Sequence, residues 1–227
     1  MLNFSQKDLP AHVLDCCKKI HKYGGEPWIV GGWVRDCFLK EKSVSDVDIE
    51  VFGLSYDVLK TLCKPICKAE FPQFGVFKCE GMDLSLPRIE YCIGKRYNSF
   101  KTSLLPNLSF RKAALRRDFT VNALAWNPII CELQDPFNGI NAIKTKQLYP
   151  ITKRFTEDAY RVLRAVQLMG RFGFVPTKPL IQLCLKLKSP ILSKAHIKRT
   201  LNCLKAAPYS DTAWQFLEQI SWTKFLK

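Results

Sequence analysis

Asp46 and Asp48 stand two residues apart in a segment where apolar and acidic residues alternate. Successive side chains of a β-strand point to opposite faces, so we expect both carboxylates to project from one face of a strand. Val47, Ile49 and Val51 would fill the other face and anchor the strand in a core. Two carboxylates held side by side can seat the divalent metal ions that handle phosphates. Asp46 and Asp48 are therefore the candidate catalytic and metal-binding residues.

A Gly-Gly pair precedes these carboxylates, in the stretch Trp-Ile-Val-Gly-Gly-Trp-Val-Arg-Asp at residues 28–36. The pattern predicts a hydrophobic strand, a turn and a short helix. Gly31 and Gly32 leave no side chain in the way of a triphosphate, and the helix start offers free backbone N–H groups. Taken singly, a Gly-Gly pair is usually only a turn and an Asp-x-Asp pair is usually a solvated strand edge. Together and in this order, the parts indicate nucleotidyl transfer.

The order of these motifs resembles the polymerase-beta-like nucleotidyltransferases. The Gly-Gly-x-Val-Arg-Asp form resembles their class II branch, the tRNA CCA-adding enzymes and bacterial poly(A) polymerases. Two later stretches are similar to motifs of that branch: Arg-Arg-Asp-Phe-Thr-Val-Asn-Ala at 116–123 and Glu-Asp-Ala-Tyr-Arg-Val-Leu-Arg at 157–164. Residues 74–90 stand where the family places later strands of its catalytic sheet.

The resemblance implies an α+β fold with two domains. Residues 1–150 would form a polymerase-beta-like nucleotidyltransferase head with a mixed sheet, and residues 151–227 an all-helical neck and basic RNA-contacting extension. The implied enzyme depends on Mg²⁺, takes CTP and ATP, and adds C or A to the 3′ end of tRNA with release of pyrophosphate. Gly32, Arg35 and Arg117 would hold the triphosphate and sugar.

Base selection is the second role that the resemblance implies, with Asp158 and Arg161 reading the base and Arg164 supporting the nucleotide. Adenine and cytosine both present an amino donor beside a ring-nitrogen acceptor. A carboxylate can accept from the amino group while a guanidinium donates to the ring nitrogen. Guanine and uracil would face the same pair with mismatched groups. A routine helix ion pair between Asp158 and Arg161 is the structural alternative.

Several alternatives stay open. Residues 116–118, Arg-Arg-Asp, could be a surface charge cluster, and Asp83 could be a third catalytic carboxylate or an ordinary strand residue. Gln167 stands where some family members carry a further arginine. At the level of function, a poly(A) polymerase shares the same head, and an inactive RNA-binding remnant would keep the fold.

Composition and charge restrict the class of protein. The chain mixes 47% hydrophobic with 24% charged residues, and it contains no apolar run of the roughly 18 residues that a membrane helix needs. The first residues lack the pattern of a signal peptide, so we expect a cytoplasmic protein. Residues 151–227 hold 14 Lys/Arg against 4 Asp/Glu, which contributes +10 of the net +15 and indicates a polyanion such as RNA. Family members usually continue into further helical domains, so a partner subunit or oligomer could complete the RNA grip.

The ten cysteines form no Cys-x-x-Cys pair, and the three histidines are not grouped with them. Most of them are expected to be small core residues in a reducing compartment. Cys63 and Cys67 could share a helical face and bind a metal, but further ligands are missing from the pattern.

Periodicity and turn residues predict the elements. A helix is expected at 8–22 and another at 55–68, followed by a hairpin of 74–79 with 82–86 and a mobile loop at 92–108. Residues 119–126 fit either a helix or a strand. Beyond about residue 150 only helices are expected, at 155–172, 180–187, 194–205 and 211–225.

Overall fold

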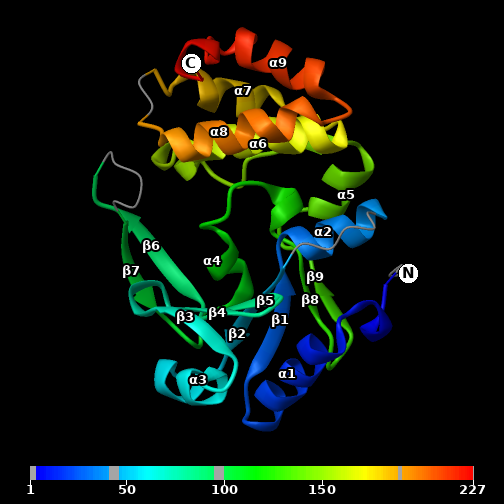
Figure 1. Ribbon diagram of the computed structural model, residues 1–227, viewed down its shortest axis with the longest axis vertical. Helices are drawn as coiled ribbons and strands as arrows, with labels where there is room; N and C mark the ends of the chain where they lie inside the picture. Colours follow the sequence, from blue (N-terminus) through cyan, green and yellow to red (C-terminus); the bar gives the residue numbers. More distant parts are fainter. Residues whose placement is uncertain (1–3, 41–45, 95–99, 189–190, 227) are drawn as a thin grey trace. The chain divides into compact units, whose positions relative to one another are not determined.

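The structure is a computed structural model that describes residues 4–40, 46–94, 100–188 and 191–226. The chain forms two compact units (Figure 1). The first, here called the α/β unit, comprises Met1–Tyr91, Lys101–Arg117 and Val121–Ile143. The second, the helical unit, comprises Cys92–Phe100, Asp118–Thr120 and Lys144–Lys227. The main change of unit therefore falls at residue 144, against the boundary at 150 expected from the sequence.

A seven-stranded sheet forms the centre of the α/β unit. Its strand order is β3-β4-β5-β2-β1-β8-β9. Strands β2 and β5 run parallel, and every other neighbouring pair is antiparallel. This confirms the mixed sheet of the expected α+β fold. The strands are β1 (Glu26–Val30), β2 (Val47–Phe52), β3 (Cys67–Phe71), β4 (Val76–Cys79), β5 (Met82–Ser85), β8 (Ala125–Asn127) and β9 (Glu132–Gln134).

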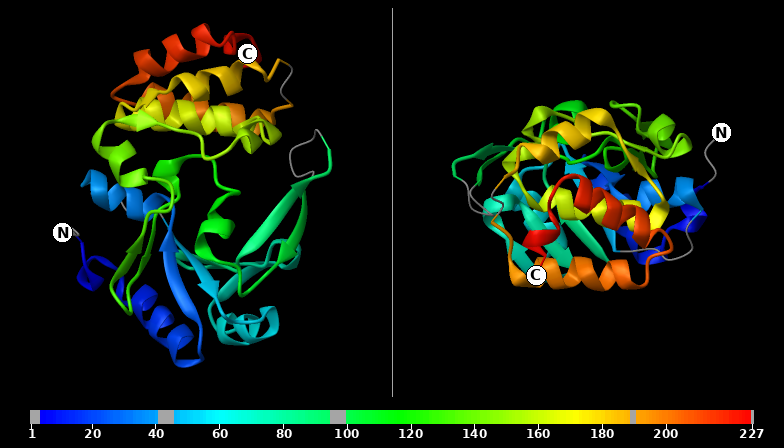
Figure 2. Two further views of the ribbon diagram at one scale, coloured as in Figure 1. Left: turned by 180° about the vertical axis from the view of Figure 1, so that it is seen from behind. Right: turned by 90° about the horizontal axis from the view of Figure 1, so that it is seen from above.

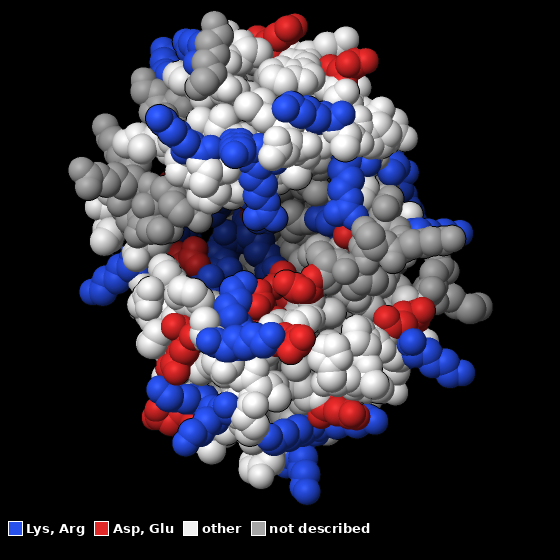
Figure 3. Space-filling view, in the orientation of Figure 1, with Lys and Arg blue, Asp and Glu red and all other residues white. Residues whose placement is uncertain are grey.

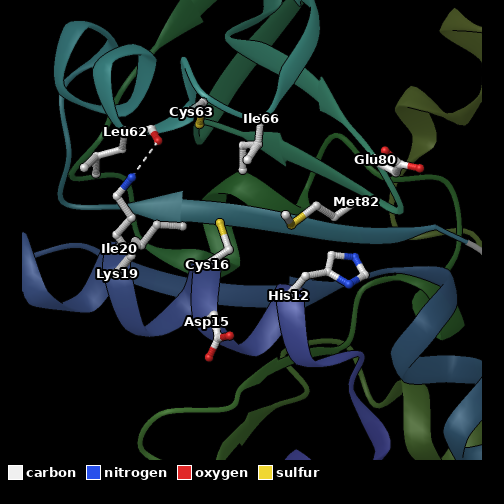
Figure 4. Close-up of a pocket in the computed structure, with 10 residues that line it drawn as sticks. All are labelled: His12, Asp15, Cys16, Lys19, Ile20, Leu62, Cys63, Ile66, Glu80 and Met82. Atoms are coloured by element: carbon white, nitrogen blue, oxygen red, sulfur yellow. Dashed lines mark hydrogen bonds between the residues drawn. The ribbon is translucent and has the colours of Figure 1, made fainter.

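The α/β unit also contains five α-helices among its described residues, and α1 and α3 lie against one face of the sheet. Residues of α1, α3 and β5 line a cavity of about 620 Å³ (Figure 4). Met82 of β5 faces this cavity, so the next residue, Asp83, points to the opposite face of the sheet. The helices of this unit are α1 (Ala11–Lys22), α2 (Gly32–Leu39), α3 (Tyr56–Cys63), α4 (Phe110–Ala114) and α5 (Gly139–Lys144).

The core of the sheet is built as the alternation in the sequence predicts. Val47, Ile49 and Val51 of β2 are at most 1% exposed, and β1 contributes the fully buried Ile29. The hairpin of β4 and β5 is also confirmed, because the two strands pair antiparallel on either side of Glu80 and Gly81.

The helical unit contains α6 (Tyr160–Phe172), α7 (Lys178–Leu185), α8 (Lys194–Lys205) and α9 (Ser210–Gln219), and α6 packs against both α8 and α9 (Figure 2). Gly170 permits a close approach, because a Cβ there would lie 2.8 Å from Cδ2 of Leu204. Gly173, with φ of 69°, ends α6 in the left-handed conformation that glycine favours. The four helices expected beyond residue 150 are present, with α8 at its predicted bounds.

Four local expectations were wrong or incomplete. The helix expected at 55–68 ends at Cys63, and Cys67 begins β3, so these two cysteines do not share a helical face. The segment 92–108 contains a strand, β7 (Phe100–Leu104), which pairs with β6 (Arg88–Cys92); residues 95–99 lie outside the described residues. The region beyond 150 is not purely helical, because the chain extends after Gly173 into β11 (Val175–Pro176), which pairs with β10 (Gln147–Leu148). Residues 119–126 are neither one helix nor one strand, since a 3₁₀ turn at Thr120–Asn122 precedes β8.

In the parts of the chain that the structure describes, every helix is too short or too polar to cross a membrane. All ten cysteines are free thiols. Within the described ranges, no three side chains of His, Cys, Asp or Glu gather closely enough to hold a metal ion, so the metal site considered for Cys63 and Cys67 lacks further ligands of these types.

Candidate active site

The two candidate catalytic carboxylates lie at the start of β2. Asp46 immediately precedes the strand, Asp48 is its second residue, and both are exposed, whereas Val47 between them is buried. In the sheet, Asp48 lies opposite Val30 of β1 and opposite Asp83 of β5. The alternation of strand side chains therefore presents Asp46 and Asp48 on the face opposite Val47.

These residues fit a site for a hard divalent cation. Carboxylate oxygens are the ligands that Mg²⁺ prefers, and Mg²⁺ usually takes one or two of them together with water and substrate phosphates. Asp83 would lie on the same face as Asp48, but its carboxylate forms an ion pair with Lys78 of β4. That ion pair favours the structural interpretation of Asp83. The protein would thus supply two carboxylates.

The Gly-Gly turn brings Asp48 and Arg117 together. Gly31 has φ of 73° and ψ of −128° and precedes α2, which begins at Gly32. A Cβ on Gly31 would lie 3.4 Å from Nη1 of Arg117 and 3.7 Å from Oδ2 of Asp48. The absence of a side chain therefore leaves room beside one guanidinium and one carboxylate, next to the N-terminus of a helix that favours anions.

Arg35 occupies a more enclosed position than its predicted role suggests. It is 7% exposed, and its guanidinium donates to Asp36 and, over 2.6 Å, to Oδ1 of Asn122. A phosphate that bound Arg35 would have to join or replace these partners. Its assignment as a nucleotide ligand stays a prediction, and its contacts also tie α2 to the segment after Arg117.

Glu50 is the residue that the sequence reasoning missed. Its side chain is fully buried, and its two oxygens accept from Nη2 of Arg116 and Nη2 of Arg117, each over 2.9 Å. Burial alone would raise the pKa of this carboxyl, but the two guanidiniums outweigh it and lower the pKa to about 2. The signal in the sequence was an acidic residue inside an otherwise buried strand, two positions beyond Asp48.

The charged cluster extends onto β6. Arg116 also lies 3.9 Å from Glu90, whose carboxylate accepts from Nε of Arg88 over 2.7 Å. Burial, and then repulsion by Arg116, lowers the pKa of Arg88 to about 10 against the pull of Glu90. We call these five residues the arginine row: Arg88, Glu90, Arg116, Glu50 and Arg117. The interpretation of Arg116 and Arg117 as a surface charge cluster is therefore wrong, since both guanidiniums are largely buried.

The predicted base-reading residues lie where α6 begins in the helical unit. The Asp158 carboxylate accepts from the backbone N–H of Tyr160 over 2.9 Å, as a helix-capping residue does. Arg161 is 8% exposed and donates to the backbone carbonyl of Arg154 over 3.0 Å. The contacts described for the two side chains thus go to different groups.

Arg164 follows one turn later on the same helix. Its side chain is 48% exposed and donates to the Asp118 carboxylate, which raises the pKa of Arg164. Gln167, at the position where some family members carry arginine, donates to Oγ1 of Thr200 on α8 over 2.8 Å. The side chain of Gln167 therefore links α6 to α8 through a hydrogen bond.

Basic side chains also gather over α8. Lys194, Lys198 and Arg199 are all exposed, and Figure 3 shows a group of Lys and Arg side chains along this helix. Exposed Lys and Arg side chains of this kind suit contacts with phosphates. The structure thus brings together Asp48, Gly31 and Arg117 in the α/β unit, and Asp158, Arg161 and Arg164 at one helix start in the helical unit.

Curated proteins of known name are similar to this chain. The Multifunctional CCA protein of Xanthomonas euvesicatoria pv. vesicatoria is 36% identical over 147 residues, which cover 64% of this chain and 35% of that protein. The Multifunctional CCA protein of Shewanella frigidimarina is 35% identical over 159 residues, which cover 69% of this chain and 38% of that protein. This chain therefore spans about a third of the length of the curated relatives it matches.

Solved structures share the fold. A crystal structure of the Bacillus stearothermophilus CCA-adding enzyme in complex with CTP matches 92% of this chain and 52% of its own, with a TM-score of 0.76 and 22% identity. The Thermotoga maritima CCA-adding enzyme complexed with tRNA_CCA matches 96% of this chain and 53% of its own, with a TM-score of 0.71 and 20% identity.

The family model described as "Poly A polymerase head domain" matches residues 27–149, more than half of the 227-residue chain. This range includes the Gly-Gly turn, both candidate catalytic carboxylates and the arginine row. The chain belongs to the Poly A polymerase head domain family.

Proposed function

We propose that this protein is a template-independent RNA nucleotidyltransferase that adds C and/or A to the 3′ end of tRNA and releases pyrophosphate. The observation that carries the proposal is the approach of Asp48 and Arg117 to the Gly31 turn, which sets a metal-binding carboxylate beside a phosphate-binding guanidinium. The curated relatives named Multifunctional CCA protein, together with the similar CCA-adding enzyme that was solved in complex with tRNA_CCA, support the choice of tRNA as the substrate.

Asp46 and Asp48 would hold Mg²⁺, since both are exposed carboxylates at the start of one strand. When bound, the metal would make the RNA 3′-hydroxyl a better nucleophile and stabilise the charge on the leaving pyrophosphate. The buried residues of β2 would keep the two carboxylates in place.

The triphosphate would lie against Gly32 and Arg117. Backbone N–H groups at the start of α2 have no partner within the helix and can donate to phosphate oxygens. Arg117 adds a cation that stabilises the negative charge of the phosphates. Arg35 is the third residue predicted to hold the triphosphate and sugar, and in the structure its guanidinium donates hydrogen bonds to Asp36 and Asn122.

The base would be read by Asp158 and Arg161, with Arg164 supporting the nucleotide. Asp158 can accept from the amino group of cytosine or adenine, and Arg161 can donate to the ring nitrogen. Arg161 lies in the first turn of α6 and Asp158 just before it, so both groups come from the protein and the selection would need no nucleic-acid template. The exposed basic face of α8 would contact the RNA backbone.

A poly(A) polymerase is the second candidate, and the name of the matching family model favours it. The same carboxylates and arginines would serve, and the two activities would differ in whether CTP is used and in how many A residues are added. An inactive RNA-binding remnant is disfavoured by the intact Asp46, Asp48 and Asp158–Arg161 motifs.

One assay distinguishes these functions. Purified protein is incubated in Mg²⁺ with a tRNA that lacks its CCA end and with each labelled nucleotide separately, then with CTP and ATP together. We expect incorporation of C and then A, with no signal from GTP or UTP and none after removal of the metal by chelation. Long runs of A from ATP alone would indicate a poly(A) polymerase. No incorporation of any nucleotide would indicate an inactive remnant.

A further inference from the structure

Glu50 is a fully buried carboxylate next to the proposed catalytic strand position. It lies two residues beyond Asp48 in β2, so the two side chains leave the strand on the same face. An isolated carboxylate in such surroundings is costly, and a buried charge persists only when it is paired and hydrogen-bonded. Both requirements are met by Arg116 and Arg117, each at 2.9 Å.

The two arginines depend on Glu50 in return. Their guanidiniums come from adjacent residues and both lie within contact of one carboxylate, so without it they would repel each other. Each carboxylate oxygen accepts from one guanidinium, which separates the two cations and fixes the direction of each. Arg116 has a second carboxylate, Glu90, at 3.9 Å.

Arg117 lies close to the Gly31 turn and to Asp48. Its Nη2 donates to Glu50, while its Nη1 donates to the backbone carbonyl of Asn122 over 3.5 Å and lies near the Gly31 turn, where a Cβ would be 3.4 Å away. One edge of the guanidinium is therefore anchored in the core of the sheet. The other edge is presented beside Asp48, whose Oδ2 would lie 3.7 Å from the same Cβ.

We propose that Glu50 is a positioning residue of the nucleotide site, which acts through Arg117 and does not itself touch the nucleotide. The inference rests on the proposed function, because it assumes that Arg117 binds the triphosphate. The two arginines that contact Glu50 then have different roles. Arg88 contacts Glu90, and Glu90 in turn lies near Arg116. Arg116 is therefore a fixed partner of Glu50, and Glu50 can hold Arg117 beside Asp48.

The alternative is that Glu50 only completes the core of the sheet. The two interpretations differ in how Glu50 and Arg117 combine. A positioning residue loses its effect on nucleotide binding once the residue through which it acts is removed, whereas a residue that only stabilises the fold keeps its own effect.

The test is a double-mutant cycle of Glu50→Gln and Arg117→Ala in the full chain. Gln has nearly the same shape as Glu, but its amide offers one acceptor oxygen and turns an N–H₂ donor toward the second guanidinium. The dissociation constant for CTP is measured by calorimetry without RNA, and KM and kcat for CTP are measured with a tRNA that lacks its CCA end. Thermal unfolding of each variant is recorded in parallel.

We expect Glu50→Gln to raise the dissociation constant and KM for CTP roughly tenfold, the size of a lost charge-assisted hydrogen bond. In the Arg117→Ala background the same substitution should change them by less than about twofold. Glu50→Asp, which keeps two acceptor oxygens on a shorter side chain, should restore part of the loss. Glu70→Gln is the matched control, because Glu70 is also held by two side chains, Tyr56 and Lys60, and its removal should leave KM for CTP unchanged.

Two results would overturn the inference while leaving the proposed function intact: a folded Glu50→Gln protein with the wild-type KM, or an equal loss with and without Arg117. If Glu50→Gln does not fold, the same cycle with Glu50→Asp decides between the same outcomes. A wild-type protein that binds no nucleotide would contradict the proposed function and this inference together.

Discussion

Arg117 of the α/β unit and Arg161 of the helical unit are both candidate nucleotide ligands, and they differ in the acceptors described for them. In the α/β unit, Arg116 and Arg117 are paired with the buried carboxylate of Glu50, which lies 66 and 67 residues away along the chain. In the helical unit, Arg161 donates to a backbone carbonyl only seven residues away, whereas the half-exposed Arg164 pairs with the buried carboxylate of Asp118, 46 residues away.

The difference matches the tasks proposed for these two arginines. The phosphates are the same in every nucleoside triphosphate, so a guanidinium fixed by a buried charge can bind all of them in one geometry. Cytosine and adenine differ in size, and side chains that read both need some freedom to adjust. The hydrogen bond from Arg161 to the neutral carbonyl of Arg154 is of a weaker type than the charge-assisted hydrogen bond from Arg117 to Glu50.

The largest expected effect lies in the α/β unit and concerns the carboxylates. Asp48→Ala or Asp46→Ala should lower nucleotide incorporation by roughly a thousandfold or more, because removing a metal ligand costs several kcal/mol of transition-state stabilisation. Both side chains are exposed, so circular dichroism and thermal unfolding should stay close to wild type. Asp57→Ala, an exposed substitution on α3, is the control. Full extension of RNA in Mg²⁺ by the double alanine variant would mean that the two-carboxylate mechanism is wrong.

The buried ion pairs should also make the α/β unit sensitive to acid. The folded pKa of Glu50 is lowered from 4.5 to about 2, so its contribution to the free energy of unfolding is fully present above pH 4.5 and is lost as the pH falls toward 2. This shift corresponds to about 3 kcal/mol. Urea unfolding of wild type and Glu50→Gln at pH 6 and pH 3 measures it, and the wild type should lose more stability between the two. Equal losses would show that Glu50 does not titrate differently in the folded state.

Substitution of the predicted base-reading residues should have a smaller effect, and it should change the preference among nucleotides. Substituting Asp158 and Arg161 with alanine should reduce the preference for CTP and ATP over GTP and UTP by about tenfold to a hundredfold, the range for one or two lost hydrogen bonds. Triphosphate binding should persist through Arg117. Incorporation of each nucleotide, measured separately, gives the ratio, with Asp211→Ala at the start of α9 as the control. An equal loss for all four nucleotides would show that the pair is structural.

The smallest effect is expected on α8. Charge reversal of Lys194, Lys198 and Arg199 should weaken tRNA binding about tenfold at low salt and flatten its dependence on salt, because phosphate contacts release counterions. CTP binding should not change. Charge reversal of three exposed lysines of the α/β unit, Lys18, Lys22 and Lys64, controls for net charge. Tight tRNA binding that hardly varies with salt would indicate recognition by shape or by a partner subunit.

Local patterns predicted the parts of the site that depend on neighbouring residues. The alternation around Asp48 identified a strand with one buried face, and the Gly-Gly pair identified the turn at Gly31. The partners of Glu50 and Arg35 were not predictable in this way, because Arg117 and Asn122 reach them from distant parts of the chain. Strand β7 was missed since its residues read as polar and its role depends on pairing with β6.

The pairing of Glu50 with Arg116 and Arg117 also has a consequence for synthesis of the chain. While a ribosome is still translating the 66 residues that separate Glu50 from Arg116, the carboxylate has no guanidinium to receive it, and strand β2 cannot be buried without a cost. Strand β1 likewise waits for β8 to pair along its second edge. Closing such long loops is slow, so we expect the central strands of the sheet to pair late in folding, after α1 and the β4–β5 hairpin have formed. A nascent chain released before residue 117 would expose the acidic strand on which the proposed chemistry depends.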